Sequence, residues 1–309
     1  MRSFSDVVGC RLPLQLAGMG SVGADAALPI AVSDAGGLGM VGGGGFPAED
    51  LADLLREMAR RTTGPFGVNF LVPFLDPAAV DVAATSAPVV EFFFGDPDAE
   101  LVSRVHERGA LAGWQVGSLD EASAAVAAAC DYVVVQGQEA GGHVRGGEPL
   151  VPLLPVVAGA TNIPVLAAGG LATARDVVEA LHEGASAVRI GTRFLAASES
   201  IAHPEYVETV IRAQASDTVI TRAFSLGWDA PHRVLKSSVE AANASSSDSI
   251  ATVASPGGEW PVPRFSPLPP TTHTRGNVTA MALYAGTSVE GVDERKPAAE
   301  IVAELLAEL

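Results

Sequence analysis

The chain alternates between short apolar runs and longer segments in which apolar residues recur at helical spacing. The short runs are rich in β-branched residues and lack apolar-polar alternation, which is typical of strands covered on both faces. Eight such runs occur, at residues 12–16, 38–41, 66–72, 89–94, 110–116, 132–136, 164–168 and 187–190. We therefore expect a parallel sheet with helices on its outer faces.

The segments between these runs carry helix signals. Leucine and methionine side chains recur at helical spacing over 51–58, and similar patterns follow the fourth and seventh runs. Ser118 precedes Glu121, and Thr173 precedes Asp176, by the spacing of a capping box at a helix start. Eight strand-helix units are the number that closes a (β/α)8 TIM barrel, which is the α/β fold that we predict. A doubly wound open sheet is the alternative, because composition and periodicity do not distinguish the two folds.

The pattern changes after the eighth run. Helical signals continue over 199–213, and residues 241–270 are then rich in Ser, Ala and Pro with little helical period. We expect this stretch to belong to a cap over the barrel mouth, and a loose surface loop is the alternative. Trp228, Trp260 and Phe265 favour packing, because large aromatic side chains gain most from burial.

The carboxy-terminal part regains helical character near residues 277–284 and again in the last turns of the chain. The final segment, 297–309, carries an apolar stripe that we expect to pack on the barrel wall, made of Ile301, Val302, Leu305 and Leu306. The predicted organisation is a barrel, a cap or substrate-pocket segment and carboxy-terminal helices that pack back on the barrel, at residues 1–213, 214–275 and 276–309.

Composition narrows the class of protein. The chain has 309 residues, of which 48% are hydrophobic and 18% charged, so it can bury a large core. Its formal charge of -17 argues against nucleic acid or an anionic membrane as a partner, because phosphate would be repelled. The two cysteines, Cys10 and Cys130, are too few for a disulfide framework, and no apolar run approaches membrane-spanning length. We expect a cytoplasmic protein.

A glycine loop with one histidine follows the sixth run. The strand 132–136 leads directly into Gly137-Gln138-Glu139-Ala140-Gly141-Gly142-His143. In a TIM barrel, such a loop lies at the catalytic rim, where glycines allow backbone and ligand to approach closely. His143 is therefore the first candidate for acid-base chemistry, and the alternative is a surface residue in a tight turn.

Two further glycine sites follow the seventh and eighth runs. Gly169 and Gly170 end one strand before a helix that begins near Thr173, and Gly191 and Thr192 end the next. Loops at these two positions are the usual phosphate site of barrels, and exposed backbone amides bind anions. Main-chain donors explain how an acidic protein can hold a phosphate without a lysine cluster.

The motifs together resemble the nitronate monooxygenase family, formerly called 2-nitropropane dioxygenases, which are FMN-dependent barrels. The resemblance rests on the histidine loop and on four further motifs, Ala17-Gly18-Met19-Gly20, Ser33-Asp34-Ala35-Gly36-Gly37-Leu38-Gly39, Ala168-Gly169-Gly170 and Gly191-Thr192-Arg193-Phe194-Leu195-Ala196 with Glu199-Ser200 beyond it. It implies a flavoprotein oxidoreductase that oxidises alkyl nitronates or nitroalkanes with molecular oxygen. The segment 227–274, which should shape the substrate pocket, matches no pattern of the family.

The resemblance also assigns roles to individual residues. It implies that His143 is the catalytic base, which removes the proton next to the nitro group. It implies that a carboxy-terminal loop, 284–288, closes over the flavin. The residues that it implies as FMN contacts are Ala17, Gly18, Met19, Asn69, Gln115, Gly142, Gly169, Gly170, Gly191, Thr192, Tyr284, Gly286 and Ser288. Met19 and Phe70 would suit a short alkyl substrate as apolar walls, although Phe70 can equally be barrel core. Asn69 can equally be a polar cap of a strand end.

Two other functions stay open. One is an FMN-dependent NAD(P)H reductase of quinones or enoyl thioesters, and the other is a non-catalytic barrel that binds a phosphate ligand. The remaining histidines fit none of these roles clearly, because His106, His182 and His203 lie on predicted helices or at their ends, whereas His232 and His273 lie near the unmatched segment. No histidine pair has metal-ligand spacing with a carboxylate, so we predict no metal.

Overall fold

All eight apolar runs are strands of one sheet in the computed structural model, which describes residues 2–23, 25–255 and 257–309. The strands are parallel to their neighbours, as their continuous apolar character predicts. Their bounds are β1 (Leu14–Leu16), β2 (Gly39–Gly42), β3 (Phe66–Leu71), β4 (Val89–Phe93), β5 (Leu111–Val116), β6 (Tyr132–Gln136), β8 (Val165–Ala168) and β9 (Ala187–Ile190).

The sheet closes on itself. Its strand order is β1-β9-β8-β6-β5-β4-β3-β2, and the two end strands meet through a parallel bridge between Gln15 and Leu38. The Leu38 amide donates to the Leu14 carbonyl at 2.8 Å, and the Leu16 amide donates to the Leu38 carbonyl at 2.9 Å. The fold is thus a (β/α)8 TIM barrel, as predicted, and the open-sheet alternative is wrong.

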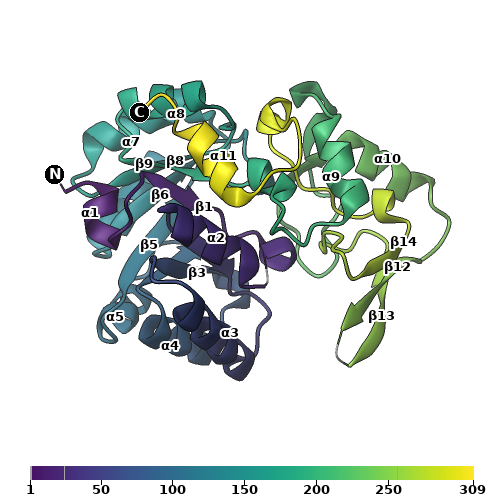
Figure 1. The fold of residues 1–309 in the computed structure, drawn as a ribbon, viewed down its shortest axis with the longest axis horizontal. Helices are drawn as coiled ribbons and strands as arrows, with labels where there is room; N and C mark the ends of the chain where they lie inside the picture. Colours follow the sequence, from purple (N-terminus) through teal and green to yellow (C-terminus); the bar gives the residue numbers. More distant parts are fainter. Residues whose placement is uncertain (1, 24, 256) are drawn as a thin grey trace.

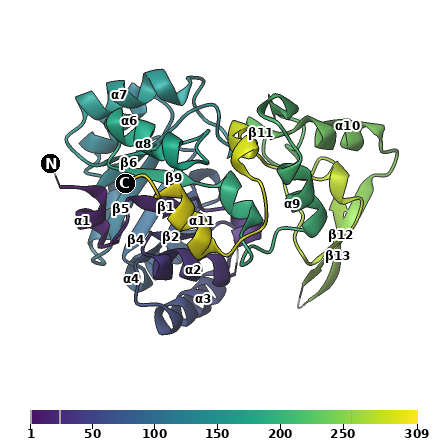
Figure 2. The ribbon, with the colours of Figure 1, turned by 45° about the horizontal axis from the view of Figure 1, so that its top comes forward.

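Helices surround the barrel as an outer layer (Figures 1 and 2). The main ones are α2 (Ala27–Ala35), α3 (Ala48–Arg61), α4 (Pro77–Ser86), α5 (Ala99–His106), α6 (Leu119–Ala127), α7 (Leu150–Ala160) and α8 (Ala174–His182), with the short α1 (Phe4–Val8) at the amino end. Thr173 and Asp176 form the predicted capping box. Ser118 caps α6, but the Glu121 carboxylate accepts from the Gly117 amide at 2.7 Å instead of completing a box.

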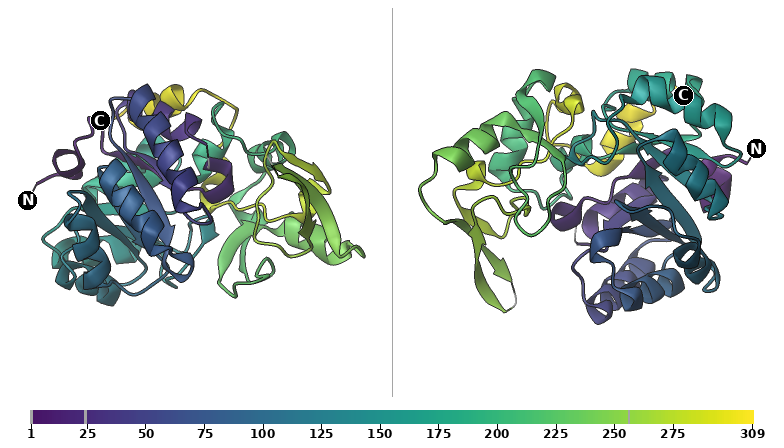
Figure 3. Two further views of the ribbon diagram at one scale, coloured as in Figure 1. Left: turned by 90° about the horizontal axis from the view of Figure 1, so that it is seen from below. Right: turned by 180° about the vertical axis from the view of Figure 1, so that it is seen from behind.

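The carboxy-terminal helix α11 (Ala298–Leu305) packs on the barrel wall, as its apolar stripe predicts. It lies against α2 and α8 and is visible in yellow in Figure 1. Ile301, Val302 and Leu305 are buried. The two chain ends therefore lie on the same side of the barrel, away from the cap (Figure 3).

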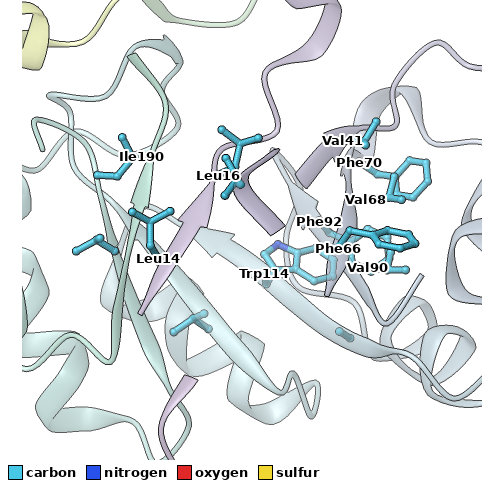
Figure 4. Close-up of a cluster of buried hydrophobic side chains, with 14 of the residues drawn as sticks. Leu14, Leu16, Val41, Phe66, Val68, Phe70, Val90, Phe92, Trp114 and Ile190 are labelled. Atoms are coloured by element: carbon cyan, nitrogen blue, oxygen red, sulfur yellow. The ribbon is translucent and has the colours of Figure 1, made fainter. Parts of the chain in front are cut away.

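The main hydrophobic core lies between the strands and the helix layer, because alternate residues of each strand point outward (Figure 4). Phe70 belongs to this core and is only 1% exposed. Its neighbour Asn69 points instead toward the barrel interior. The expectation that Phe70 walls the substrate pocket is therefore wrong, because strand periodicity places it on the opposite face from Asn69.

A smaller cap follows the barrel and stands beside it in Figures 1 and 3. It contains two antiparallel sheets, of which β12 (Ser249–Ser255), β13 (Gly258–Pro263) and β14 (Thr274–Gly276) form one. The other consists of β10 (Thr218–Thr221), β11 (His232–Leu235) and β7 (Gly142–His143). Because β7 is part of the histidine loop, this second sheet connects the barrel rim directly to the cap.

The cap has its own core around Phe224, Val234 and Met281, with helices α9 (Pro204–Ile211) and α10 (Lys236–Ala244) beside it. The stretch 241–270 contains the end of α10 and the long hairpin of β12 and β13, so the alternative of a loose surface loop is wrong. The expected helical character near 277–284 is also wrong, because this segment forms only the 3-10 turn η5 (Val278–Ala280). Apolar residues of 278–283 are buried in almost continuous succession, so tertiary packing overrides their helical propensity. The other 3-10 turns are η1 (Gly20–Gly23), η2 (Val72–Phe74), η3 (Thr192–Ala196), η4 (Ala215–Asp217) and η6 (Thr287–Gly291).

A glycine on β5 leaves the space that the Tyr132 ring fills inside the barrel. A Cβ atom on Gly113 would lie 2.2 Å from Tyr132 Cζ, whereas Gly159 on the exposed face of α7 has open space around it. Gly113→Ala should lower the free energy of unfolding by about 1–3 kcal/mol through overpacking. Gly159→Ala is the matched control and should raise it by up to about 1 kcal/mol. Urea unfolding of both variants measures the difference, and equal stabilities would contradict the packing described here.

Candidate active site

A cavity of about 590 Å³ lies at the carboxyl ends of the barrel strands. This is within the usual size range of small-molecule and cofactor pockets. Its barrel side is formed by strand ends and the loops that follow them. Its outer wall comes from two segments of the cap, namely Leu226, Gly227 and Trp228, and then Pro267, Leu268 and Pro269.

The cavity collects nearly all of the residues that the sequence singled out. Those lining it are Ala17, Gly18, Met19, Asn69, Gln115, Gly142, His143, Gly169, Gly170, Gly191, Thr192, Tyr284 and Ser288. Gly286 does not line it and instead packs behind it. The Gly286 amide donates to Thr192 Oγ1 at 3.0 Å, and a Cβ atom at this position would lie 2.8 Å from the Gly141 nitrogen.

The histidine loop is held from both sides. Gln136 Nε2, at the end of β6, donates to the His143 carbonyl at 2.9 Å, and its Oε1 accepts from the Arg145 amide at 3.3 Å. On the other side, His143 pairs with His232 across β7 and β11. Gly142 has a φ of 80°, a left-handed conformation that glycine adopts without strain. The chain direction at His143 is thus fixed by barrel and cap together.

Aromatic rings surround the imidazole of His143. The Trp228 ring centroid lies 4.3 Å away, and the rings of Tyr284, His232 and Phe94 lie at 5.6, 5.7 and 6.0 Å. Phe94 has a φ of 64°, which is strained for a bulky residue. This strained residue directly follows β4, and its ring also packs on Trp228 at 4.7 Å. The pocket walls therefore fix the plane of the imidazole without a hydrogen bond.

The imidazole of His143 is neutral at physiological pH. Burial lowers its pKa to about 3, and the nearby His232 contributes in the same direction. His232 itself donates from Nδ1 to the Ala230 carbonyl at 2.9 Å and accepts at Nε2 from the Phe224 amide at 3.2 Å, so it is held as the neutral ring. In the described part of the chain, no group hydrogen bonds to either ring nitrogen of His143, which leaves both for a ligand.

The two glycine sites at the ends of β8 and β9 offer backbone donors to the cavity. Gly170 has a φ of 75°, and within residues 2–23, 25–255 and 257–309 no acceptor takes the amides of Gly170, Gly191 or Thr192. One part of the expectation was wrong. Two amides at the start of α8 are already occupied, because the Asp176 carboxylate accepts from Ala172 and Thr173 at 2.9 and 2.8 Å, and the first turn of α8 does not line the cavity. The donors that face the cavity are therefore those of the glycine loops.

The loop 284–288 connects the parts of the site. The Tyr284 hydroxyl donates to the Pro267 carbonyl in the cap at 2.8 Å, and the Thr287 amide donates to the Glu139 carbonyl in the histidine loop at 3.0 Å. The Tyr206 hydroxyl donates to the Tyr284 carbonyl. Burial raises the pKa of the Tyr284 phenol, so this group stays protonated and acts as a donor.

A polar floor lies below the cavity, inside the barrel. Asn69 Nδ2 donates to Glu91 Oε1 at 2.8 Å, and the Arg189 guanidinium forms an ion pair with the same carboxylate. Asn69 and Arg189 line the cavity, whereas Glu91 is fully buried beneath it. Asn69 therefore lines the cavity with a side-chain amide that is oriented by a buried carboxylate.

Sequence reasoning did not single out several residues of the site, namely Phe74, Gln136, Arg189, Tyr206, Leu226 and Trp228 as cavity-lining groups. One signal was available for Arg189, because a charged residue in the middle of a buried strand needs a partner. The cap residues gave no such signal, since their positions depend on a fold that the sequence pattern did not predict.

The remaining histidines lie outside the cavity. His203 caps α9 by accepting from the Glu205 amide at 3.2 Å, His106 contacts Asp131 at 2.9 Å, and His182 is exposed at the end of α8. His232 supports His143 from behind, and His273 is exposed. Across the described residues, no group of three or more His, Cys, Asp or Glu side chains could hold a metal ion, and no helix is long and apolar enough to cross a membrane.

The fold and cavity together define a TIM-barrel enzyme, because the catalytic sites of such barrels lie at the carboxyl ends of the strands. Residues 2–308 match the nitronate monooxygenase family. The chain therefore belongs to this family.

Relatives of known sequence differ in their named activities. A dehydrogenase of a hydroxy-methyl-oxo-octahydroindene carboxyl-CoA from Mycobacterium tuberculosis is 34% identical over 236 residues, 75% of this chain. The matched stretch spans 65% of that enzyme's own length, slightly less than two thirds. A probable nitronate monooxygenase from Staphylococcus aureus is 31% identical over 245 residues, which cover 64% of this chain and 69% of the relative.

Solved structures resemble the whole chain. FabK from Thermotoga maritima superimposes with a TM-score of 0.80 and 31% identity, covering 100% of this chain and 96% of that one. A nitroalkane oxidase from Streptomyces ansochromogenes gives a TM-score of 0.79 and 28% identity, covering 100% and 98%. The cap is thus shared with these structures as well as the barrel.

The low pKa of His143 predicts a pH dependence of stability. The folded protein keeps this ring neutral down to a pKa of about 3, whereas the unfolded chain binds a proton below 6.5. His143 therefore does not reduce the free energy of unfolding above pH 6.5. Below pH 6.5 the unfolded chain gains a proton that the folded ring does not bind, so the free energy of unfolding falls progressively as the pH approaches 3. His143→Gln should show a shallower loss of unfolding free energy than the wild type over this range. Urea unfolding at several pH values tests this, and parallel curves would contradict the burial of the ring.

Proposed function

We propose that this protein binds FMN in the cavity and oxidises alkyl nitronates or nitroalkanes with molecular oxygen, with His143 as the base. The observation that carries the proposal is the meeting of two features in one cavity. A neutral imidazole with both ring nitrogens available faces the same space as the free amides of Gly170, Gly191 and Thr192. The first feature suits proton removal from carbon, and the second suits a phosphate.

The residues present fit FMN. The amides at the ends of β8 and β9 would hold the phosphate, which needs no cationic side chain in this acidic protein. The backbone of Ala17 and Gly18 would lie along the ring system. Small residues allow this close approach, because a Cβ atom on Gly18 would already lie 2.8 Å from Asn69 Cβ. Asn69 and Gln115 would meet the polar edge of the ring.

When bound, FMN supplies electron acceptance from the substrate and electron transfer to oxygen. His143 takes the proton from the carbon next to the nitro group. Its neutral state makes it available as an acceptor at neutral pH. The negative charge that develops on the nitro group favours the imidazolium by Coulomb attraction and so offsets the low pKa of the buried ring. Trp228 and Tyr284 hold the imidazole and exclude water from it.

The cavity wall supports a small apolar substrate. Phe74, Trp228 and Leu226 line the outer side. Arg189 is the single charged side chain that lines the cavity in the described part of the chain, and its charge is paired with Glu91. A substrate with several phosphate groups would find no cation there, whereas a short alkyl nitronate needs only an apolar wall and a base.

A second candidate is an FMN-dependent reductase that uses NADH or NADPH to reduce quinones or enoyl thioesters. The similarity to the carboxyl-CoA dehydrogenase of Mycobacterium tuberculosis favours a thioester substrate for it. The phosphate groups of a coenzyme A ester would have to lie outside the cavity, because the lining has no free cation among the described residues. Membership of an enzyme family argues against the third hypothesis, a silent phosphate-binding barrel.

An anaerobic absorbance experiment separates the candidates. The purified protein, loaded with FMN, is mixed separately with propyl nitronate, NADH and NADPH. We expect rapid loss of the oxidised flavin absorbance with propyl nitronate and slow loss, or none, with the two nicotinamides. Rapid bleaching by NADH or NADPH together with no response to the nitronate would support the reductase instead.

The base assignment predicts a substrate-dependent effect of His143→Ala. The variant should keep bound FMN but lose about 10²–10⁴-fold in kcat/KM with a neutral nitroalkane, which requires proton removal. The loss should be much smaller with the preformed nitronate, from which that proton is already absent. His182→Ala, on the exposed end of α8, is the matched control. Steady-state oxygen consumption measures all three proteins, and equal losses with both substrates would remove the base assignment.

The phosphate site predicts loss of cofactor in Gly191→Val, because the side chain would enter the space between the amides and Ala17. A Cβ atom there already lies 3.3 Å from Ala17 Cβ. Gly147→Val is the control, since Gly147 follows the histidine loop and has open space around it. We expect FMN content near zero in the first variant and near the wild-type value in the second. Normal FMN occupancy in a folded Gly191→Val protein would show that the phosphate lies elsewhere.

A further inference from the structure

The barrel interior contains an ion pair directly below the cavity. Arg189 lies on β9 and is 6% exposed, while Glu91 lies on β4 and is completely buried. In the strand order of the closed sheet, β4 is four strands away from β9 in either direction. The two side chains therefore reach toward each other across the barrel. The guanidinium lies toward the barrel axis and not at the rim, where the phosphate amides are.

The Glu91 carboxylate is the centre of a hydrogen-bond network. Besides the Arg189 guanidinium, it accepts from Asn69 Nδ2 at 2.8 Å, from Gln15 Nε2 at 3.0 Å and from the Tyr132 hydroxyl at 3.0 Å. Burial, with the Glu91 charge nearby, raises the pKa of the Tyr132 phenol, so it remains a donor. The carboxylate is thus held by four groups from four other strands of the barrel.

Stability alone does not explain this network. Burying two charges costs solvation energy that their attraction rarely exceeds, and aliphatic side chains of similar volume commonly stabilise as well or better. Branched aliphatic residues usually fill the layers of a TIM barrel. Here the charged layer lies directly beneath the cavity, and Arg189 and Asn69 reach its surface. The position of the pair therefore points to a ligand above it.

We infer that Arg189 sets the reduction potential of the bound flavin, an inference that rests on the FMN part of the proposed function. The isoalloxazine ring gains electrons on reduction, and a fixed positive charge below the cavity stabilises the negative charge that results. Arg189 is the charged group that faces the cavity, whereas Glu91 lies behind Arg189 and does not line the cavity. Glu91 fixes the guanidinium and reduces its effect, so it opposes Arg189 in the same site.

The two partners then predict shifts of opposite sign. Arg189→Gln alone would leave the fully buried Glu91 carboxylate without its cation. The comparison therefore uses Glu91→Gln as its background, because the unpaired Arg189 guanidinium lines the cavity and can be hydrated there. Glu91→Gln should raise the potential of bound FMN above the wild-type value. Adding Arg189→Gln to this background should lower the potential of bound FMN again by at least about 30 mV. For a two-electron couple, this corresponds to a tenfold change in the equilibrium constant. Adding Arg189→Lys instead keeps the charge and should leave the potential near that of Glu91→Gln.

The measurement is anaerobic reduction of each FMN-loaded protein in equilibrium with a reference dye, with flavin content and thermal unfolding recorded for every variant. Equal potentials in Glu91→Gln and in its Arg189→Gln derivative would overturn the inference. So would a Lys derivative that behaves like the Gln derivative, because only a packing role treats them alike.

The experiments distinguish a failure of this inference from a failure of the proposed function. Shifted potentials in a protein that does not oxidise nitronates would support the inference and refute the substrate. Nitronate oxidation with unshifted potentials would refute the inference alone. A protein that takes up no FMN would overturn both.

Discussion

The site depends on the pairing of the histidine loop with the cap. Barrel closure brings the carboxyl ends of all the strands to one rim, and His143 is held there by Gln136 of the barrel and by the short strand β7, which pairs with β11 of the cap. This pairing places Trp228 and Tyr284 against the imidazole and makes the cap the outer wall of the cavity. The outer wall of the cavity and the surroundings of the imidazole therefore both depend on this pairing.

Much of the barrel could be predicted from local sequence. Every barrel strand could be recognised as an apolar run, because parallel strands that are buried on both faces are apolar at almost every position. The glycine and histidine motifs lie at strand ends, so the barrel topology alone brings them together. The residues around the cavity that were expected to meet do so, apart from Gly286, whose backbone packs behind the cavity, and Phe70, whose side chain belongs to the outer core.

The cap could not be predicted in the same way. Its strands β12 and β13 are exposed on one side and rich in Ser and Pro, so their sequence resembles a loop. The segment 277–284 looked helical because apolar residues are frequent there, but Ala280, Met281 and Ala282 are all buried in the core of the cap and Leu283 in a second cluster, so no single face stays exposed as in a surface helix. The Asp176 carboxylate at the start of α8 was visible as a capping box, and it accepts from the amides of Ala172 and Thr173, which are therefore not available to a phosphate.

A crystal structure of the protein with bound FMN is the most direct test of the central claim, that one cavity places a flavin between the glycine amides and His143. The phosphate should accept hydrogen bonds from the amides of Gly170, Gly191 and Thr192, with the ring system over Asn69 and one face open toward the imidazole. Electron density for FMN at another place, or a ring separated from His143 by the wall of the cavity, would contradict the account.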